Sequence, residues 1–310
     1  MKLLKATFAL SGWGLVLLGT SGVSAFCRTT TCDLSASCSD EPEKCCRFDS
    51  SGCDRNGLPL AWRGNCVSFA IHEAGSTKRD ISAGALEGLV DQAFAAWLTT
   101  TCNSSPLSLE ASSLGMVECR QQEYSEENAN ANIWMFRDED WPYGRRGSSA
   151  AGQVSSNQLA ITTVSFNWKT GELYDADVEF NAAQLNFSTG DENVTNDLLS
   201  IATHEAGHFL GLDHSDDYQS TMTAGYIPGS VAARTLAVDD ESAICEVYPP
   251  DRRLAEAQTC EPRGGFSSTC SETGGCSCKL SDPAQPFAGA SAWSLLTLAL
   301  VWLRRRRRAA

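Results

Sequence analysis

Residues 204–214 have the sequence HEAGHFLGLDH, which fits H-E-x-x-H-x-x-G-x-x-H at every specified position. Side chains four residues apart lie on one face of a helix, so His204 and His208 can bind a single zinc ion. Gly211 can adopt the positive φ that ends a helix and reverses the chain, which returns His214 as a third ligand. Three protein ligands leave a fourth position for water, as in catalytic rather than structural zinc sites.

Glu205 follows the first ligand, so its carboxylate can lie beside the metal without binding it. Zinc lowers the pKa of water towards ~7 and polarises a substrate carbonyl. We therefore expect peptide hydrolysis by a zinc-activated water, with Glu205 as the general base that passes the proton to the leaving amine. The alternative is a solvated helix with incidental histidines, but the full pattern arises by chance in about one chain in 10⁵ or fewer.

Composition places the chain outside the cytosol. It has 310 residues, a formal net charge of −14 and 14 cysteines, and such cysteine use indicates an oxidising compartment. The acidic body makes nucleic acid an unsuitable partner. Seven cysteines lie between Cys27 and Cys66 without paired C-x-x-C units, which favours disulfides over a metal site. Because seven is odd, at least one of them pairs elsewhere or stays free.

The two ends of the chain carry targeting signals. Residues 1–25 combine two lysines, an apolar stretch and a small-x-small end, which predicts a signal peptide rather than a buried helix. Residues 287–303 form an apolar, uncharged run that precedes the basic tail 304–310. That order favours a transmembrane segment with its arginines on the cytoplasmic side over a nucleic-acid patch, although the run is slightly short for a bilayer.

The pattern in between predicts an α+β domain over 58–250. A Cys-rich segment, 26–57, precedes it, and a polar Cys-containing linker, 251–286, follows it. A helix is expected from an N-cap at Ser82 to Trp97 because apolar residues recur there at helical spacing. Further strands are expected at 66–71, 132–136, 159–166 and 173–180, and further helices from 196 or 197 into the histidines and over 239–248.

The motif resembles that of the metzincin metallopeptidases, which also have a methionine turn such as Met222 provides. Ser215 directly follows the third histidine, and a serine at this position resembles the matrixin, or matrix-metalloproteinase-like, branch. The resemblance covers roughly 58–250 and implies a zincin fold, in which a mixed twisted sheet carries an active-site helix. It also implies one catalytic Zn²⁺ and protein or peptide substrates.

Roles follow from the resemblance. His204, His208 and His214 match the zinc ligands, Glu205 the general base, and Met222 the residue beneath the zinc. Tyr226 matches a tyrosine in the wall of the pocket for the residue after the scissile bond. Residues 159–166 match the edge strand that pairs with an extended peptide.

Three departures from the family pattern stand out. Ala224 replaces the proline that usually follows the methionine turn. Only His72 remains for a second, structural zinc, so that site is expected to be absent. The cysteine-switch motif P-R-C-G-x-P-D is missing, which leaves the mode of latency open; one of the N-terminal cysteines could cap the zinc instead.

A calcium site is a further hypothesis. Its candidate ligands are oxygen-bearing residues in or near one loop, and a solvated acidic surface is the favoured alternative. These residues are Asp175, Asp177, Asp191, Glu192 and Asn193.

The C-terminus resembles the MYXO-CTERM class of bacterial sorting tails. The resemblance rests on Gly275-Cys276-Ser277-Cys278, the apolar run and the arginine cluster. It implies cleavage near the cysteine and a protein at the cell surface or outside the bacterial cell, with membrane contact through 287–303 before processing. The leading hypothesis is thus a secreted or surface-attached zinc endopeptidase. The alternative is a non-enzymatic, Cys-rich surface or adhesion protein with a relic zinc site.

Overall fold

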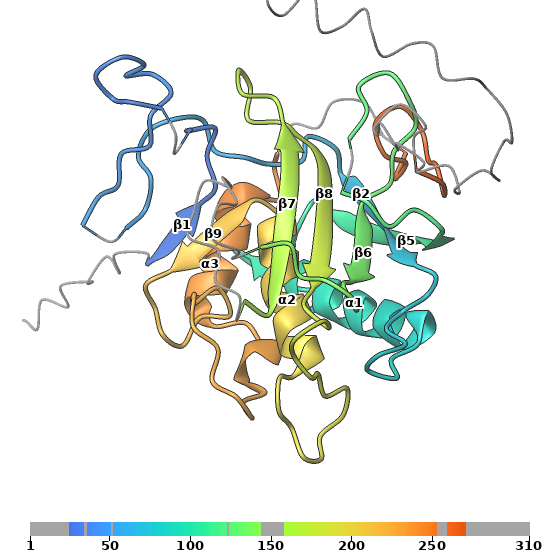
Figure 1. Cartoon of the computed structure of the whole chain (residues 1–310). Helices are drawn as coiled ribbons and strands as arrows, with labels where there is room; N and C mark the ends of the chain where they lie inside the picture. The colour runs from blue at the N-terminus through green and yellow to red at the C-terminus, as the bar shows by residue number, and fades with distance from the viewer. Residues whose placement is uncertain are drawn as a thin grey trace, which may run out of the picture. The chain divides into compact units, whose positions relative to one another are not determined.

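A five-stranded mixed sheet forms the centre of the computed structural model (Figure 1). Four neighbouring strands run parallel, and the strand at one edge runs antiparallel to its neighbour. The predicted α+β class and mixed sheet are therefore confirmed. In spatial order the strands are β5 (Glu110–Val117), β2 (Cys66–His72), β6 (Ile133–Phe136), β8 (Leu173–Phe180) and β7 (Ala160–Phe166). Of these, only β5 was not expected from the sequence.

The structure describes residues 25–33, 36–50, 52–122, 124–143, 158–252 and 259–270. Within these ranges no helix is both long and apolar enough to span a bilayer. The predicted signal peptide, apart from Ala25, lies outside the described residues, as do the apolar run 287–303 and the basic tail 304–310. These three features stay predictions.

Two helices cover one face of the sheet (Figure 1). Helix α1 (Ala83–Leu98) begins at the expected N-cap Ser82, whose side chain accepts from the Ala85 amide, and α2 (Leu198–Phe209) begins at Asp197. The two helices pack on each other and on the sheet through fully buried rings, where Phe94 meets Phe209 and Trp134 edge to face. This packing holds α2 rigidly against the sheet.

The remaining elements lie around this core. Helix α3 (Val238–Val247) matches the helix expected at 239–248. Strand β1 (Phe26–Arg28) pairs antiparallel with β9 (Leu212–Ser215), which the sequence did not predict (Figure 1). The elements still to be named are the strands β3 (Thr101–Cys102) and β4 (Ser105–Pro106) and the 3-10 turn η1 (Ala232–Arg234).

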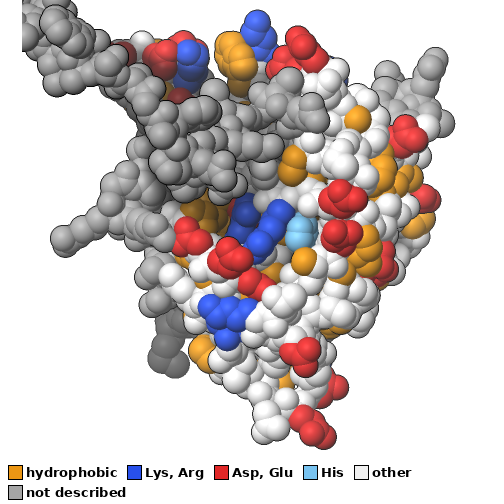
Figure 2. Space-filling view, turned by 45° about the vertical axis from the view of Figure 1, so that its right-hand side comes forward, with side chains coloured by type: hydrophobic (Ala, Val, Ile, Leu, Met, Phe, Trp, Pro, Cys, Tyr) orange, Lys and Arg blue, Asp and Glu red, His pale blue; other side chains and the backbone are white. Residues whose placement is uncertain are grey.

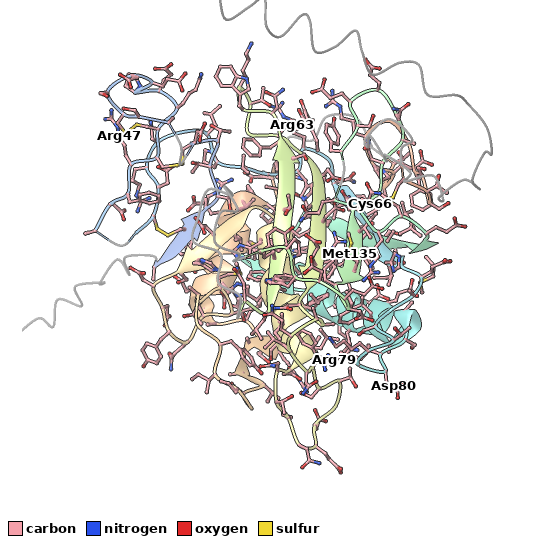
Figure 3. All side chains as sticks on the ribbon, in the orientation of Figure 1. Arg47, Arg63, Cys66, Arg79, Asp80 and Met135 are labelled. Carbon is pink, nitrogen blue, oxygen red and sulfur yellow. A yellow bond between two sulfur atoms is a disulfide. The ribbon has the colours of Figure 1, made fainter. Side chains whose placement is uncertain are left out.

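Disulfides occur as expected, with six among the described residues. Three lie inside the Cys-rich segment, and the seventh N-terminal cysteine, Cys66, labelled in Figure 3, pairs with Cys260. The idea of an N-terminal thiol that caps the zinc is therefore wrong, because all seven sulfurs are bonded. The pairs are 27–53, 32–46, 38–45, 66–260, 102–245 and 119–270.

The surface agrees with the acidic composition. On the face drawn in Figure 2, acidic side chains are spread widely, whereas basic ones gather in a few places. Among the described side chains on this face there is no broad basic patch of the kind that attracts a polyanion.

Candidate metal centre

The structure brings the three motif histidines together. His204 and His208 project from successive turns of α2, and His214 lies on β9. One ring nitrogen from each lies within 4.8 Å of the others. The reversal occurs at Gly211, whose φ of +91° fits the expectation, and a Cβ there would lie 2.5 Å from the Leu60 carbonyl oxygen. Only glycine meets both conditions.

Backbone carbonyls orient two of the rings. His204 Nδ1 lies 2.7 Å from the Thr221 oxygen, and His208 Nδ1 lies 2.9 Å from the Leu212 oxygen. A carbonyl oxygen only accepts, so Nδ1 carries the hydrogen in both rings and Nε2 keeps its lone pair. The third ring differs, because the Nδ1 of His214 lies 3.9 Å from a carboxylate oxygen of Asp213, which is too far for a hydrogen bond.

Electrostatics keep the imidazoles neutral. Burial lowers the pKa of His204, His208 and His214, and each ring's pKa is lowered further by a neighbouring histidine. Neutral imidazoles are the form that binds metal. Three neutral nitrogen donors on the wall of a cavity match a catalytic zinc site with one position left for water or substrate.

A second group of three potential ligands exists among the described residues, but it does not suit a metal. It consists of Cys32, Cys46 and Asp54, and the two cysteines form a disulfide with each other.

The predicted calcium ligands do not form such a group within the described ranges. Asp191 pairs with Arg234 at 2.6 Å, and the buried Asp177 accepts from the Ile133 amide at 2.7 Å. Calcium therefore stays a prediction.

Glu205 lies beside the ligands with its carboxylate almost completely buried. Burial raises the pKa of Glu205, while the neighbouring His204 and the hydrogen bond from Thr162 act in the opposite direction. The Thr162 hydroxyl, on the edge strand β7, donates to Oε2 at 2.5 Å. The sequence did not single out Thr162. Because side chains alternate along a strand, Thr162 lies on the same face as Ala160 and Val164. That alternation does not predict which other element the face contacts.

Met222 packs against α2, the helix that carries two of the three histidines. Its side chain is 1% exposed, and a Cβ on Gly207 of α2 would meet its sulfur at 2.3 Å. Asp240 of α3 holds this turn, since its carboxylate accepts from the Thr221 amide at 2.7 Å and the Met222 amide at 3.2 Å. The sequence identified Asp240 only as part of a helix start, where acidic residues are common for local reasons.

A cavity of about 930 Å³ contains the histidines and Glu205. Edge strand β7 and the residues just before it form one wall, and Tyr226 forms part of another. The Tyr226 hydroxyl accepts from the Asp197 amide at 2.8 Å and donates to the Ser230 carbonyl at 2.8 Å. It thus ties the loop after Met222 to the start of α2.

Comparison with known proteins places this centre in context. A profile described as Matrixin matches residues 61–249. Metalloendoproteinase 1-MMP of Arabidopsis thaliana is 38% identical over 65 residues, 21% of this chain and 18% of the relative. Matrix metalloproteinase-C of Caenorhabditis elegans is 41% identical over 61 residues, 18% and 10% of the two chains.

A third relative is viral. Probable matrix metalloproteinase 095L of Invertebrate iridescent virus 3 is 30% identical over 129 residues, 35% of each chain. The chain thus spans about a third or less of the length of these three relatives.

Proposed function

This chain belongs to the matrixin family of metallopeptidases, and from that premise we propose that it is a secreted or surface-attached zinc endopeptidase. The observation that carries the proposal is the convergence of three neutral histidines and one buried carboxylate in a single cavity. The non-enzymatic alternative does not require a buried carboxylate beside the three histidines.

The reaction uses residues with separate tasks. His204, His208 and His214 would hold a zinc ion, which when bound would supply Lewis acidity to acidify a water and polarise the scissile carbonyl. Glu205 takes the proton from the attacking water and delivers it to the leaving amine, which releases the two peptide products. The Thr162 hydroxyl holds the Glu205 carboxylate in place for both transfers.

Substrate binding rests on β7. It ends the sheet order, and residues 159–162 of this region face the cavity together with Val164. An extended peptide that pairs with this edge would gain main-chain hydrogen bonds independent of its sequence. Tyr226 then bounds the pocket for the residue after the scissile bond.

The proposed location is outside the cell. Six disulfides support an oxidising compartment. The predicted signal peptide and sorting tail would deliver the protein there, with membrane contact through 287–303 before processing.

The test is replacement of the base. Glu205→Ala should reduce peptide hydrolysis by about 10²–10⁴-fold, the contribution of a general base, while one zinc stays bound. Glu126→Ala removes the same charge from an exposed loop and is the matched control. Unchanged hydrolysis in Glu205→Ala would refute this mechanism, and an inactive, zinc-loaded wild-type protein would favour the non-enzymatic alternative.

A further inference from the structure

The N-terminal strand lies against the chain reversal that carries the third histidine. The Leu212 carbonyl, which accepts from His208 Nδ1 at 2.9 Å, also accepts from the Thr29 hydroxyl at 3.0 Å. The Thr29 amide donates to the preceding carbonyl, that of Gly211, at 3.1 Å. One residue of the Cys-rich segment therefore binds two successive carbonyls, those of Gly211 and Leu212, in the turn between the second and third ligands.

The same strand is attached at its other end. Phe26 is in register with Ser215, the residue after His214. Asp239 of α3 accepts from the Phe26 amide at 3.2 Å and from the Ser215 hydroxyl at 2.7 Å. Strand β9 is thus fixed at both ends by contacts that involve β1, and His214 lies between them.

Disulfide Cys27–Cys53 holds β1 in turn. Both cysteines are buried, at 6% and 2% exposure, so the link lies inside the contact rather than on the surface. The body of the segment, marked by Arg47 in Figure 3, lies to one side of the sheet. Of its described residues, Thr29 alone lines the cavity, so this part of the segment borders the site without crossing it.

We propose that Thr29 and β1 position the metal site. The Thr29 hydroxyl fixes the Leu212 carbonyl that orients His208, and β1 fixes the strand that presents His214. This inference rests on the zinc site of the proposed function. It assigns the Cys-rich segment a supporting role at that site, in contrast to a segment that confers latency by covering the ligands.

Physical reasons favour an effect on affinity. Hydrogen-bond partners of metal-bound histidines change metal affinity by about 10–100-fold when removed. Thr29 does not contact His208 directly but bonds the Leu212 carbonyl that accepts from His208. We therefore expect an effect at the low end of that range. Thr29→Val keeps the branched shape and removes only the hydroxyl, whereas Thr29→Ser keeps the hydroxyl.

The experiment measures the zinc Kd of the whole protein by competition with a chelator, and thermal unfolding of the zinc-free form checks that each variant is folded. Thr29→Val should raise the Kd about tenfold, and Thr29→Ser should restore it. Thr31→Val is the matched control, because it removes a hydroxyl that accepts from the Leu58 amide, away from the turn. Equal Kd values for Thr29→Val and Thr31→Val would overturn the role of Thr29.

A second pair of variants tests the strand. The double change Cys27→Ser and Cys53→Ser frees β1, and the control removes Cys38–Cys45 in the same segment. Release of β1 should raise the zinc Kd about 10–100-fold and lower kcat/KM, while the control stays within about twofold of wild type. An unchanged Kd, or a rise in kcat/KM as expected for a latency segment, would overturn the proposal. The Kd needs no peptide substrate, so this result is independent of the Glu205 test.

Discussion

The ligands on α2 and the ligand on β9 are positioned in different ways. His204 and His208 lie one turn apart on a helix, and that spacing is set by local hydrogen bonds. His214 depends on the positive φ of Gly211, on the close approach of Leu60 and on the pairing of β9 with β1. We call His204 and His208 the α2 half of the metal site, and His214 with its turn the β9 half. The comparison teaches that the α2 half is a local property of the sequence, whereas the β9 half depends on contacts between distant segments.

The largest effect is expected from Gly211→Ala, which disrupts the β9 half of the metal site. Gly211→Ala places a Cβ 2.5 Å from the Leu60 carbonyl oxygen and forces alanine to φ +91°. The left-handed conformation alone costs about 1–2 kcal/mol, and the backbone clash adds to it. We expect the zinc Kd to rise by more than the ~100-fold upper bound for an outer partner. Chelator competition measures this, and Gly190→Ala, with open space around its Cβ, is the control.

A smaller effect is expected from Gly207→Ala, which strains the packing of α2 without moving its two ligands apart. Gly207→Ala places a Cβ 2.3 Å from the Met222 sulfur and 2.8 Å from the Trp97 ring. Overpacking of this kind costs about 1–3 kcal/mol and exceeds the gain of ~1 kcal/mol in helix propensity. We expect a lower Tm but a zinc Kd within a few-fold of wild type.

The control for this variant is Gly88→Ala. It lies on α1 with nothing within 4 Å of its Cβ, so it should be neutral or raise the Tm. A loss of zinc affinity in Gly207→Ala as large as in Gly211→Ala would contradict the comparison.

A third prediction concerns pH. Burial lowers the pKa of the three histidines below the ordinary 6.5, so the unfolded chain binds more protons than the folded one. Their contribution to stability is present above pH 6.5 and is lost as the pH falls through the folded pKa values. The Tm of the zinc-free protein should therefore rise from pH 5 to pH 7.

The same measurement separates the two halves. His204 and His208 are partly buried, whereas His214 is exposed. His208→Gln should accordingly flatten the pH dependence more than His214→Gln does. An equal slope for the two variants would show that the halves do not differ in this respect.

The smallest effect comes from β7, which carries no ligand. Thr162→Val removes the hydrogen bond to the Glu205 carboxylate and so raises the pKa of Glu205. We expect the acidic limb of the kcat/KM profile to move to higher pH and the rate to fall about 2- to 10-fold, from a net bond of ~0.5–1.5 kcal/mol. A change in zinc Kd would argue that β7 supports the ligands as well as the base.

The elements predicted from periodicity agree with the structure where a single amphipathic face decided them. The apolar stripe from Leu86 to Trp97 is the buried face of α1. Strand β5, with a sequence of small and polar residues, was not expected because one edge strand with little burial has a weak pattern. The partners Thr162 and Asp240 were missed for a related reason, since hydrogen bonds across elements have no sequence spacing.

The sequence by itself determined the donor set: three histidines, one glutamate and one turn glycine, at spacings that only a helix followed by a reversal can use. It also determined the α+β class and the need for disulfides. Tertiary structure alone decided which carbonyls orient the rings, which hydroxyl holds Glu205, and that an N-terminal strand supports β9. The physical reason is that helix geometry repeats every few residues, whereas β1 and β9 are joined by hydrogen bonds across more than 180 residues of chain.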